Sequence, residues 1–233
     1  MSVRYALYFS PVTNSCLAAF GAASLGRSAT LARATNVGSP HPNKARWLAL
    51  TQPPAHYGFH ATLKAPFELR SGTNIEALTQ ELKQFARELS PIPLEGLAPR
   101  QLSGFAALTL PSQPAALRTL AQKVVETFEP YRQPLSDTDI QRRKKQQLTP
   151  RQTELLEQYG YPYVDEEFRF HMTLTGPITE QDNDYVEWLK TLYRQFVTDT
   201  PMLDQITIYS QPDRNSPFVK IQACPLATAG QPA

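Results

Sequence analysis

Hydrophobic and polar positions follow strand and helix periods in turn along the chain. The first segment, 3–11 (VRYALYFSP), is rich in aromatic and β-branched residues and stops at a Ser-Pro break, which predicts a strand. An Ala-rich stretch, 14–26, follows and predicts a short helix that stops at Gly26. The next segment, 33–46, contains mainly turn-forming residues, so we expect a loop there.

Apolar residues recur at helical spacing in three later segments. These predicted helices cover 74–90, 113–130 and 180–197. Two regions instead carry short strand-like runs on either side of a turn, namely 91–111 around Ser103-Gly104 and 204–226 around the turn PDRNSP. Each helix–strand–strand series follows a stretch that has the alternation of a strand.

Those two stretches repeat one phrase, GFHATLKAPF at 58–67 and RFHMTLTGPI at 169–178. They share Phe, His, Thr, Leu and Pro at matching offsets. Alternate side chains of a strand lie on the same face. One face would then carry Gly58, His60, Thr62 and Lys64 in the first phrase, and Arg169, His171, Thr173 and Thr175 in the second. The other faces are apolar, so each strand is expected to present imidazole, hydroxyl and cation to the same side.

The order strand–helix–strand–strand therefore follows each phrase and predicts an α+β fold. We expect two lobes that are pseudo-symmetric units, each with an antiparallel sheet and flanking helices, and an active-site cleft between them. We take residues 1–233 as one two-lobed domain. The polar, basic segment at about 130–160 would connect the halves, with a helix near 149–159 that starts at a Thr-Pro cap. This segment contains the basic run Arg142–Lys145, which most often forms a solvated face.

Composition narrows the class of protein. Hydrophobic residues make up 41% of the chain, enough for a packed core, and the formal net charge of +2 does not indicate a general nucleic-acid binder. The two cysteines, Cys16 and Cys224, have no zinc-site spacing and are expected to be buried free thiols. No signal peptide and no membrane span of about 20 apolar residues is evident, which favours a soluble, cytoplasmic protein.

The doubled His-x-Thr group fits the chemistry of phosphate esters. Opening a cyclic phosphodiester needs a base for the attacking water and an acid for the leaving oxygen. Histidine serves either role near neutral pH. The hydroxyls of Thr62 and Thr173 would bond the non-bridging oxygens. This scheme requires neither metal nor cofactor, and the phrases lack the carboxylates or cysteines that would complete a metal site.

The motifs HATL at 60–63 and HMTL at 171–174 resemble those of the two-histidine (2H) phosphoesterase superfamily. That resemblance implies a bilobal α+β protein that acts on cyclic phosphates or 2′-5′ linkages, usually without metal. It implies His60 and His171 as the acid–base pair and Thr62 and Thr173 as phosphate-binding residues. The longer strings HYGFHATLKAPF and FRFHMTLTGPI are similar to a branch associated with bacterial phosphonate degradation. The branch suggests a ribose cyclic phosphate from carbon–phosphorus lyase chemistry as substrate.

A second phosphate on the substrate would require more positive charge near the histidines. Lys64 and Arg169 are the candidate substrate-binding cations, and Tyr57 and Tyr5 are candidates for the border of the cleft. The remaining histidines, His41 and His56, are expected to be non-catalytic.

Two other functions fit the same motifs. One is an RNA 2′,3′-cyclic phosphodiesterase or 2′-5′ RNA ligase-like enzyme, which would use the basic connection to hold RNA. The other is a non-catalytic scaffold that binds phosphorylated ligands. The expected partner is a small cyclic phosphate, with RNA less favoured and no membrane. The sequence leaves open the oligomeric state and which histidine is the acid.

Overall fold

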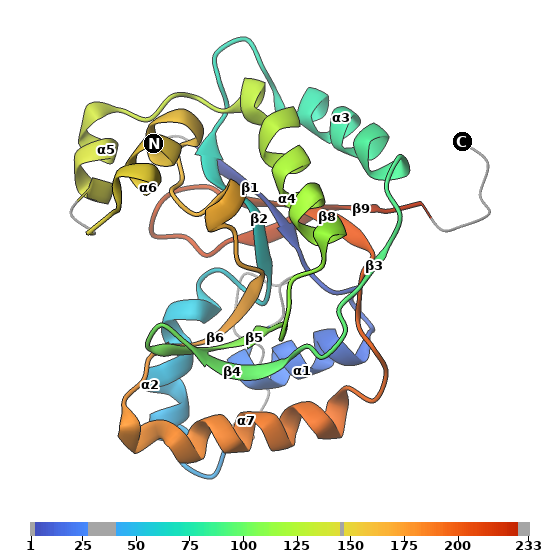
Figure 1. Ribbon diagram of the computed structural model, residues 1–233, viewed down its shortest axis with the longest axis vertical. Helices are drawn as coiled ribbons and strands as arrows, with labels where there is room; N and C mark the ends of the chain where they lie inside the picture. Colours follow the sequence, from blue (N-terminus) through green and yellow to red (C-terminus); the bar gives the residue numbers. More distant parts are fainter. Residues whose placement is uncertain (1–2, 28–40, 145–146, 228–233) are drawn as a thin grey trace.

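A computed structural model describes residues 3–27, 41–144 and 147–227, and these form an α+β fold (Figure 1). An antiparallel seven-stranded sheet has the order β4-β5-β6-β2-β1-β8-β9, and a two-stranded sheet pairs β3 with β7. The strands are β1 Arg4–Phe9, β2 Ala61–Glu68, β3 Ile92–Pro93, β4 Ala98–Leu102, β5 Phe105–Thr109, β6 His171–Pro177, β7 Met202–Leu203, β8 Gln205–Gln211 and β9 Val219–Pro225. The predicted fold class is thereby confirmed.

The helices divide between two groups of strands. The α-helices are α1 Cys16–Leu25, α2 Lys44–Ala55, α3 Ile75–Arg87, α4 Ala115–Thr127, α5 Asp137–Lys144, α6 Pro150–Tyr159 and α7 Asn183–Phe196. Helices α1, α2 and α7 pack with β4, β5 and β6, and we call this group lobe A. Helices α3 and α4 pack with β2, β1, β8 and β9, which we call lobe B (Figure 1).

The lobes meet at one place in the large sheet. Strand β2 begins directly after His60, and β6 begins at His171. These two strands pair through Ala61 and Met172 alone. Both of these residues are buried, at 1% and 0% exposure. The sheet is therefore two sub-sheets of three and four strands that separate on either side of this pair.

The predicted order strand–helix–strand–strand is present after each motif, as β2-α3-β4-β5 and as β6-α7-β8-β9, with β3 and β7 as short additions. In space the two series exchange their hairpins. The hairpin β4-β5 pairs with β6 in lobe A, whereas β8-β9 pairs with β1 in lobe B. The connections cross where β3 pairs with β7, through Ile92 and Leu203. Each lobe is consequently completed by the chain that follows the other lobe's motif.

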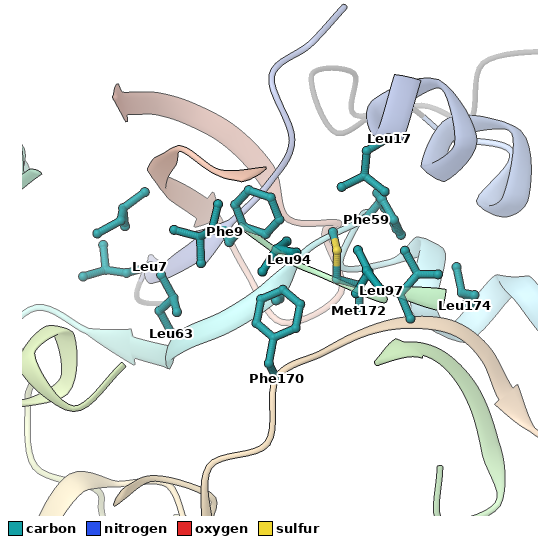
Figure 2. Close-up of a cluster of buried hydrophobic side chains, with 14 of the residues drawn as sticks. Leu7, Phe9, Leu17, Phe59, Leu63, Leu94, Leu97, Phe170, Met172 and Leu174 are labelled. Atoms are coloured by element: carbon teal, nitrogen blue, oxygen red, sulfur yellow. The ribbon is translucent and has the colours of Figure 1, made fainter. Parts of the chain in front are cut away.

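One hydrophobic core runs through both lobes. Figure 2 shows part of it, with Leu7 and Leu63 from lobe B and Met172 and Leu174 from lobe A. The rings of Phe9 and Phe170 have their centroids 6.2 Å apart across the junction. Because the apolar faces of both motif strands are buried in this shared core, their polar faces are fixed relative to one another.

Helix α1 begins and ends as its sequence predicts. The Ser15 side chain accepts a hydrogen bond from the Ala18 backbone, and Gly26 closes the helix with a φ of 65°. Cys16 and Cys224 are free, as expected, but Cys16 is exposed rather than buried.

Helix α2 was not predicted. Residues 33–40 of the expected loop lie outside the described residues, but Lys44–Arg46 already belong to the helix. Asn43 caps its first turn by accepting from the Arg46 backbone. Two prolines, Pro53 and Pro54, lie in its last turns. The helix packs on β6, which explains why tertiary contacts override its weak helical pattern.

The connecting segment contains α5 and α6. The helix predicted at 149–159 is confirmed as α6, where Thr149 and Gln152 form a capping box and Pro150 occupies the first turn. Of the basic run, Arg142 pairs with Asp139 and Lys144 with Glu157, whereas Lys145 lies outside the described residues. Within the described ranges, the structure contains no helix with the length and apolar character needed to span a bilayer.

Candidate active site

His60 lies immediately before β2, after a turn that closes α2. Gly58 has a φ of 77° in this turn, a conformation that favours glycine. The turn brings the Gly58 carbonyl 2.9 Å from His60 Nδ1. Because a carbonyl oxygen only accepts, Nδ1 donates its proton and the neutral ring has an unprotonated Nε2. The Thr62 hydroxyl lies 3.3 Å from that Nε2.

The other imidazole has the same arrangement at the start of β6. His171 Nδ1 lies 2.8 Å from the Arg169 carbonyl, again two residues earlier in the chain. Its Nε2 is therefore the unprotonated nitrogen of the neutral ring. On one side the ring faces Phe105 of β5, with centroids 6.0 Å apart. The repeated phrase thus fixes the same tautomer twice.

The pairing of Ala61 with Met172 sets how the motifs face each other. In an antiparallel register, the residue before Ala61 lies across from the residue after Met172. This register aligns His60 with Thr173 and Thr62 with His171. The two histidines lie close enough for His171 to lower the pKa of His60. Thr62 of one motif and His171 of the other line the same pocket.

The environment lowers the pKa of both imidazoles. Burial, together with the nearby His171, lowers the pKa of His60 to about 4, against a smaller opposing effect of the bond to Gly58. The pKa of His171 is also lowered by burial, and its bond to the Arg169 carbonyl opposes this. Desolvation disfavours the charged ring in both places. Both rings are therefore poised as neutral proton acceptors.

Tyr8 holds the His60 ring from behind. The two rings are stacked, with centroids 3.8 Å apart and an interplanar angle of 22°. Tyr8 is 1% exposed and packs in a small cluster with Tyr209 and Phe218 on the sheet face opposite the main core. The sequence predicted the strand that carries Tyr8 but gave no signal for this contact, because the stacking depends on the pairing of β1 with β2.

A pocket of about 460 Å³ opens at His171 and Thr62. Its aromatic wall comes from Phe105, Tyr161 and Tyr163, and its polar lining includes Ser103, Gln152, Glu167 and Arg169. Tyr161 and Tyr163 belong to the segment after α6 and were not predicted as site residues. The sequence shows them as part of an aromatic string, YGYPY at 159–163, but only the folded chain reveals that this string lies at the site.

Lys64 does not lie on the face that strand alternation predicts. It is 3% exposed, and its Nζ lies 3.0 Å from the carbonyl of Val125 in α4 and 2.8 Å from Oε2 of Glu129, just after the end of that helix. A bulge explains the difference. Tyr8 and Leu7 are successive residues of β1 but pair with Thr62 and Lys64, which leaves an extra residue in β2. The bulge turns Lys64 away from Thr62 and into the lobe.

Of the other predicted substrate-binding residues, Arg169 and Tyr57 lie near the histidines and Tyr5 does not. Arg169 is exposed and lines the pocket beside His171. Tyr57 is 41% exposed, with its ring centroid 6.3 Å from that of His60. Tyr5, in contrast, packs against the main core, and burial and the nearby Glu76 of α3 raise its pKa. Because it shares a face with the core-facing Leu7, Tyr5 lies on the helix-covered side and not beside His60.

The other two histidines have structural surroundings. His56 Nε2 accepts from the Gln211 side-chain amide at 3.1 Å. His41 lies against Tyr185 and Trp188 near α7. No group of three or more His, Cys, Asp or Glu side chains in the described part of the chain is arranged to hold a metal ion.

Sequence comparison shows that the chain belongs to the family described as protein of unknown function DUF1045, which matches residues 62–219. The chain is 36% identical to ribose 1,5-bisphosphate phosphokinase PhnN of Janthinobacterium sp. (strain Marseille), over 99% of this chain and 52% of that protein. A protein of the same name from Laribacter hongkongensis (strain HLHK9) is 36% identical over 77% of this chain and 42% of its own length. The chain thus spans about half the length of these curated relatives.

Comparison of structures finds a chain described as the crystal structure of a phosphoesterase. It covers 96% of this chain and 98% of its own length, with 12% identity and a TM-score of 0.39.

Proposed function

We propose that this chain is a metal-independent phosphodiesterase that opens a small cyclic phosphate. The observation that carries the proposal is the matched pair of imidazoles. In each, Nδ1 donates to the backbone carbonyl two residues earlier, which leaves Nε2 for proton transfer. We infer that each ring uses a threonine hydroxyl from the opposite motif, which is supported by the shared pocket of Thr62 and His171 and by the pairing of Ala61 with Met172 between the motifs.

In the proposed reaction a water attacks phosphorus while the ring P–O bond breaks. His60 Nε2 removes the proton of the water, since its lowered pKa keeps the ring neutral at pH 7. His171 gives its Nε2 proton to the leaving oxygen, so the product is a phosphomonoester with a free hydroxyl. The negative charge of a bound phosphate would favour the protonated form of His171. Thr62 and Thr173 donate to the non-bridging oxygens.

The names of the relatives support a ribose phosphate as substrate. Kinases of the P-loop type hold phosphate with the sequence G-x-x-x-x-G-K-[ST]. The nearest match in this chain, GAASLGRS from Gly21, has Arg27 in the lysine position, and its first five residues lie in helix α1 rather than in a loop. We assign kinase activity to the part of those relatives that this chain does not match. A ribose cyclic phosphate formed in phosphonate catabolism, by carbon–phosphorus lyase chemistry, is the proposed substrate here.

The test measures phosphate ester opening by the wild type, His60→Ala and His171→Ala, with a 5-phosphoribose 1,2-cyclic phosphate. Each substitution is expected to lower kcat by about 10²- to 10⁴-fold, the usual contribution of general acid–base catalysis. His41→Gln is the matched control and should retain activity. Addition of EDTA should change nothing. Full activity in either alanine variant, or loss of activity in EDTA, would disprove the proposal.

A further inference from the structure

A second pocket, of about 470 Å³, lies between lobe B and the connecting segment. Five arginines line it, namely Arg4, Arg132, Arg142, Arg143 and Arg214. They come from β1, from the chain after α4, from α5 and from the turn between β8 and β9. Only two carboxylate residues, Glu68 and Asp139, are among the lining residues. The pocket therefore carries an excess of positive charge.

Three of the arginines are already paired with carboxylates. Asp139 lies 2.6 Å from Arg142 and 3.3 Å from Arg214. Arg132 lies 2.6 Å from Glu129 and also donates to the Gln158 carbonyl. These contacts fix the wall of the pocket, and because Asp139 is shared by Arg142 and Arg214 they neutralise only part of its positive charge.

Arg4 and Arg143 bond neutral groups instead. Arg4 Nε donates to the Gln211 side-chain oxygen at 2.8 Å, and Arg143 donates to the Gly160 carbonyl at 2.7 Å. In the described part of the chain neither guanidinium has a carboxylate partner. Burial lowers the pKa of each, and neighbouring arginines, Arg142 among them, lower it further. Two partly desolvated guanidiniums that form no ion pair with a carboxylate favour the binding of an anion.

The pocket adjoins the histidine site on two sides. Arg4 lies over the Phe218 ring at 5.6 Å, and Phe218 is stacked on Tyr57, which borders His60. On the other side, the Gly160 carbonyl bonded by Arg143 immediately precedes Tyr161, which lines the pocket at His171. These contacts connect the arginine pocket to the histidine site through Phe218 and Tyr57 on one side and through the Gly160–Tyr161 segment on the other.

We propose that the arginine pocket binds a terminal phosphomonoester carried by the same molecule whose cyclic ester lies between His60 and His171. This inference rests on the proposed function and narrows its substrate class to cyclic phosphates with a second phosphate group. A phosphomonoester carries about 1.5 to 2 negative charges at pH 7 and presents three acceptor oxygens. The planar guanidinium fork matches that geometry.

The first test compares two substrates, 5-phosphoribose 1,2-cyclic phosphate and the same cyclic ester without its 5-phosphate. Arg4→Gln and Arg143→Gln should each lower kcat/KM for the phosphorylated substrate by about 10- to 100-fold, as expected for a charge-assisted bond. Both variants should leave kcat/KM for the unphosphorylated ester unchanged. Arg87→Gln, an exposed change on α3, is the control and should affect neither substrate.

An equal loss on both substrates, or no loss on either, would overturn the pocket proposal while leaving the hydrolase intact. Preference for an RNA oligonucleotide with a 2′,3′-cyclic end, weakened by the same variants, would also overturn it in favour of RNA. The second test is calorimetric binding of ribose 5-phosphate, which needs no turnover. Binding by the wild type that is lost in Arg143→Gln supports the pocket even if no cyclic ester is opened. Absence of binding by the wild type counts against the pocket.

Discussion

At the scale of single residues, the surroundings of His60 decide its protonation. The Gly58 carbonyl orients one nitrogen, and the stacked Tyr8 ring keeps water from one face. Burial is the largest cause of the lowered pKa. The same contacts that make the ring a neutral base therefore also fix its direction.

Replacing Tyr8 by leucine should raise the pKa of His60. Loss of the stacked ring admits water, which stabilises the imidazolium, and a shift upward of about one unit is expected. Tyr8→Phe retains the ring and should leave the pKa where it is. NMR titration of the His60 ring protons measures both variants. An unchanged pKa in Tyr8→Leu would show that the stacking does not maintain the low value.

The stability of the protein should fall as pH is lowered from roughly 6.5 to 4. The folded state holds His60 neutral with a pKa of about 4, whereas the unfolded chain takes up a proton near its ordinary value. More protons are bound by the unfolded state in this window, so acid favours unfolding. Between pH 7 and pH 5 the loss from His60 should be about 1–2 kcal/mol.

Urea unfolding at the two pH values measures this loss. His60→Gln removes the titrating group and should show a smaller loss of stability over the same interval. An identical loss in the variant would mean that other groups cause the acid sensitivity.

Two features of the site could not be predicted from the sequence, namely a bulge in one strand and the contacts made by long-range strand pairing. The His-x-Thr spacing was sufficient to predict that Ala61 and Leu63 are buried beneath a polar face. Strand alternation predicted the wrong face for Lys64, because a bulge in β2 interrupts the alternation. Tyr8 and Tyr161 approach the site from segments far away in the chain, and no local pattern of hydrophobic or polar residues encodes such contacts.

At the scale of elements, helix α1 is set close against the turn before His60. A Cβ atom added at Gly21 would lie 2.0 Å from the Phe59 ring, far inside van der Waals contact. Gly21→Ala should therefore destabilise the fold by about 1–3 kcal/mol, although alanine normally stabilises a helix interior. Thermal unfolding measures the change. The control Ala19→Gly, at an exposed position of the same helix, should cost about 1 kcal/mol from propensity alone.

The attachment of α4 to β2 depends on the buried pair of Lys64 and Glu129. Glu129→Gln leaves the Lys64 ammonium without a counter-ion and also removes the partner of Arg132, so a loss of about 3–5 kcal/mol is expected. Lys64→Met should cost less, because Glu129 keeps its bond to Arg132. Glu126→Gln, at an exposed position of α4, is the control. Urea unfolding that ranked Lys64→Met as the more damaging change would contradict this account.

Helices with regular apolar spacing or clear caps were predictable, whereas α2 was not. The helices α3, α4, α6 and α7 follow regular apolar spacing, and all four are present. Helix α2 contains two prolines and a nearly even distribution of polar residues. Its buried side, including Trp47 and Leu50, covers β6. The helix therefore forms because of contacts with a distant strand, which its own pattern of residues does not reveal.

At the scale of the whole molecule, the shared core predicts that both lobes unfold together. Met172 is fully buried at their junction, and Met172→Ala should cost about 2–5 kcal/mol. The two tryptophans, Trp47 and Trp188, both lie in lobe A, so their fluorescence reports on that lobe, whereas far-UV circular dichroism reports on both. The two signals should give coincident transitions in the wild type and the variant. Separate midpoints would show independent lobes.

The exchange of hairpins makes each half of the chain depend on the other for a complete sheet. A single strand–helix–hairpin unit leaves its own motif strand without the neighbour that completes the sheet. Such a unit, expressed as a separate polypeptide, would close only by associating with a second copy about a two-fold axis. One imidazole would then come from each subunit. In the present chain both halves lie in one polypeptide, so each lobe receives its hairpin from the other half without a second subunit.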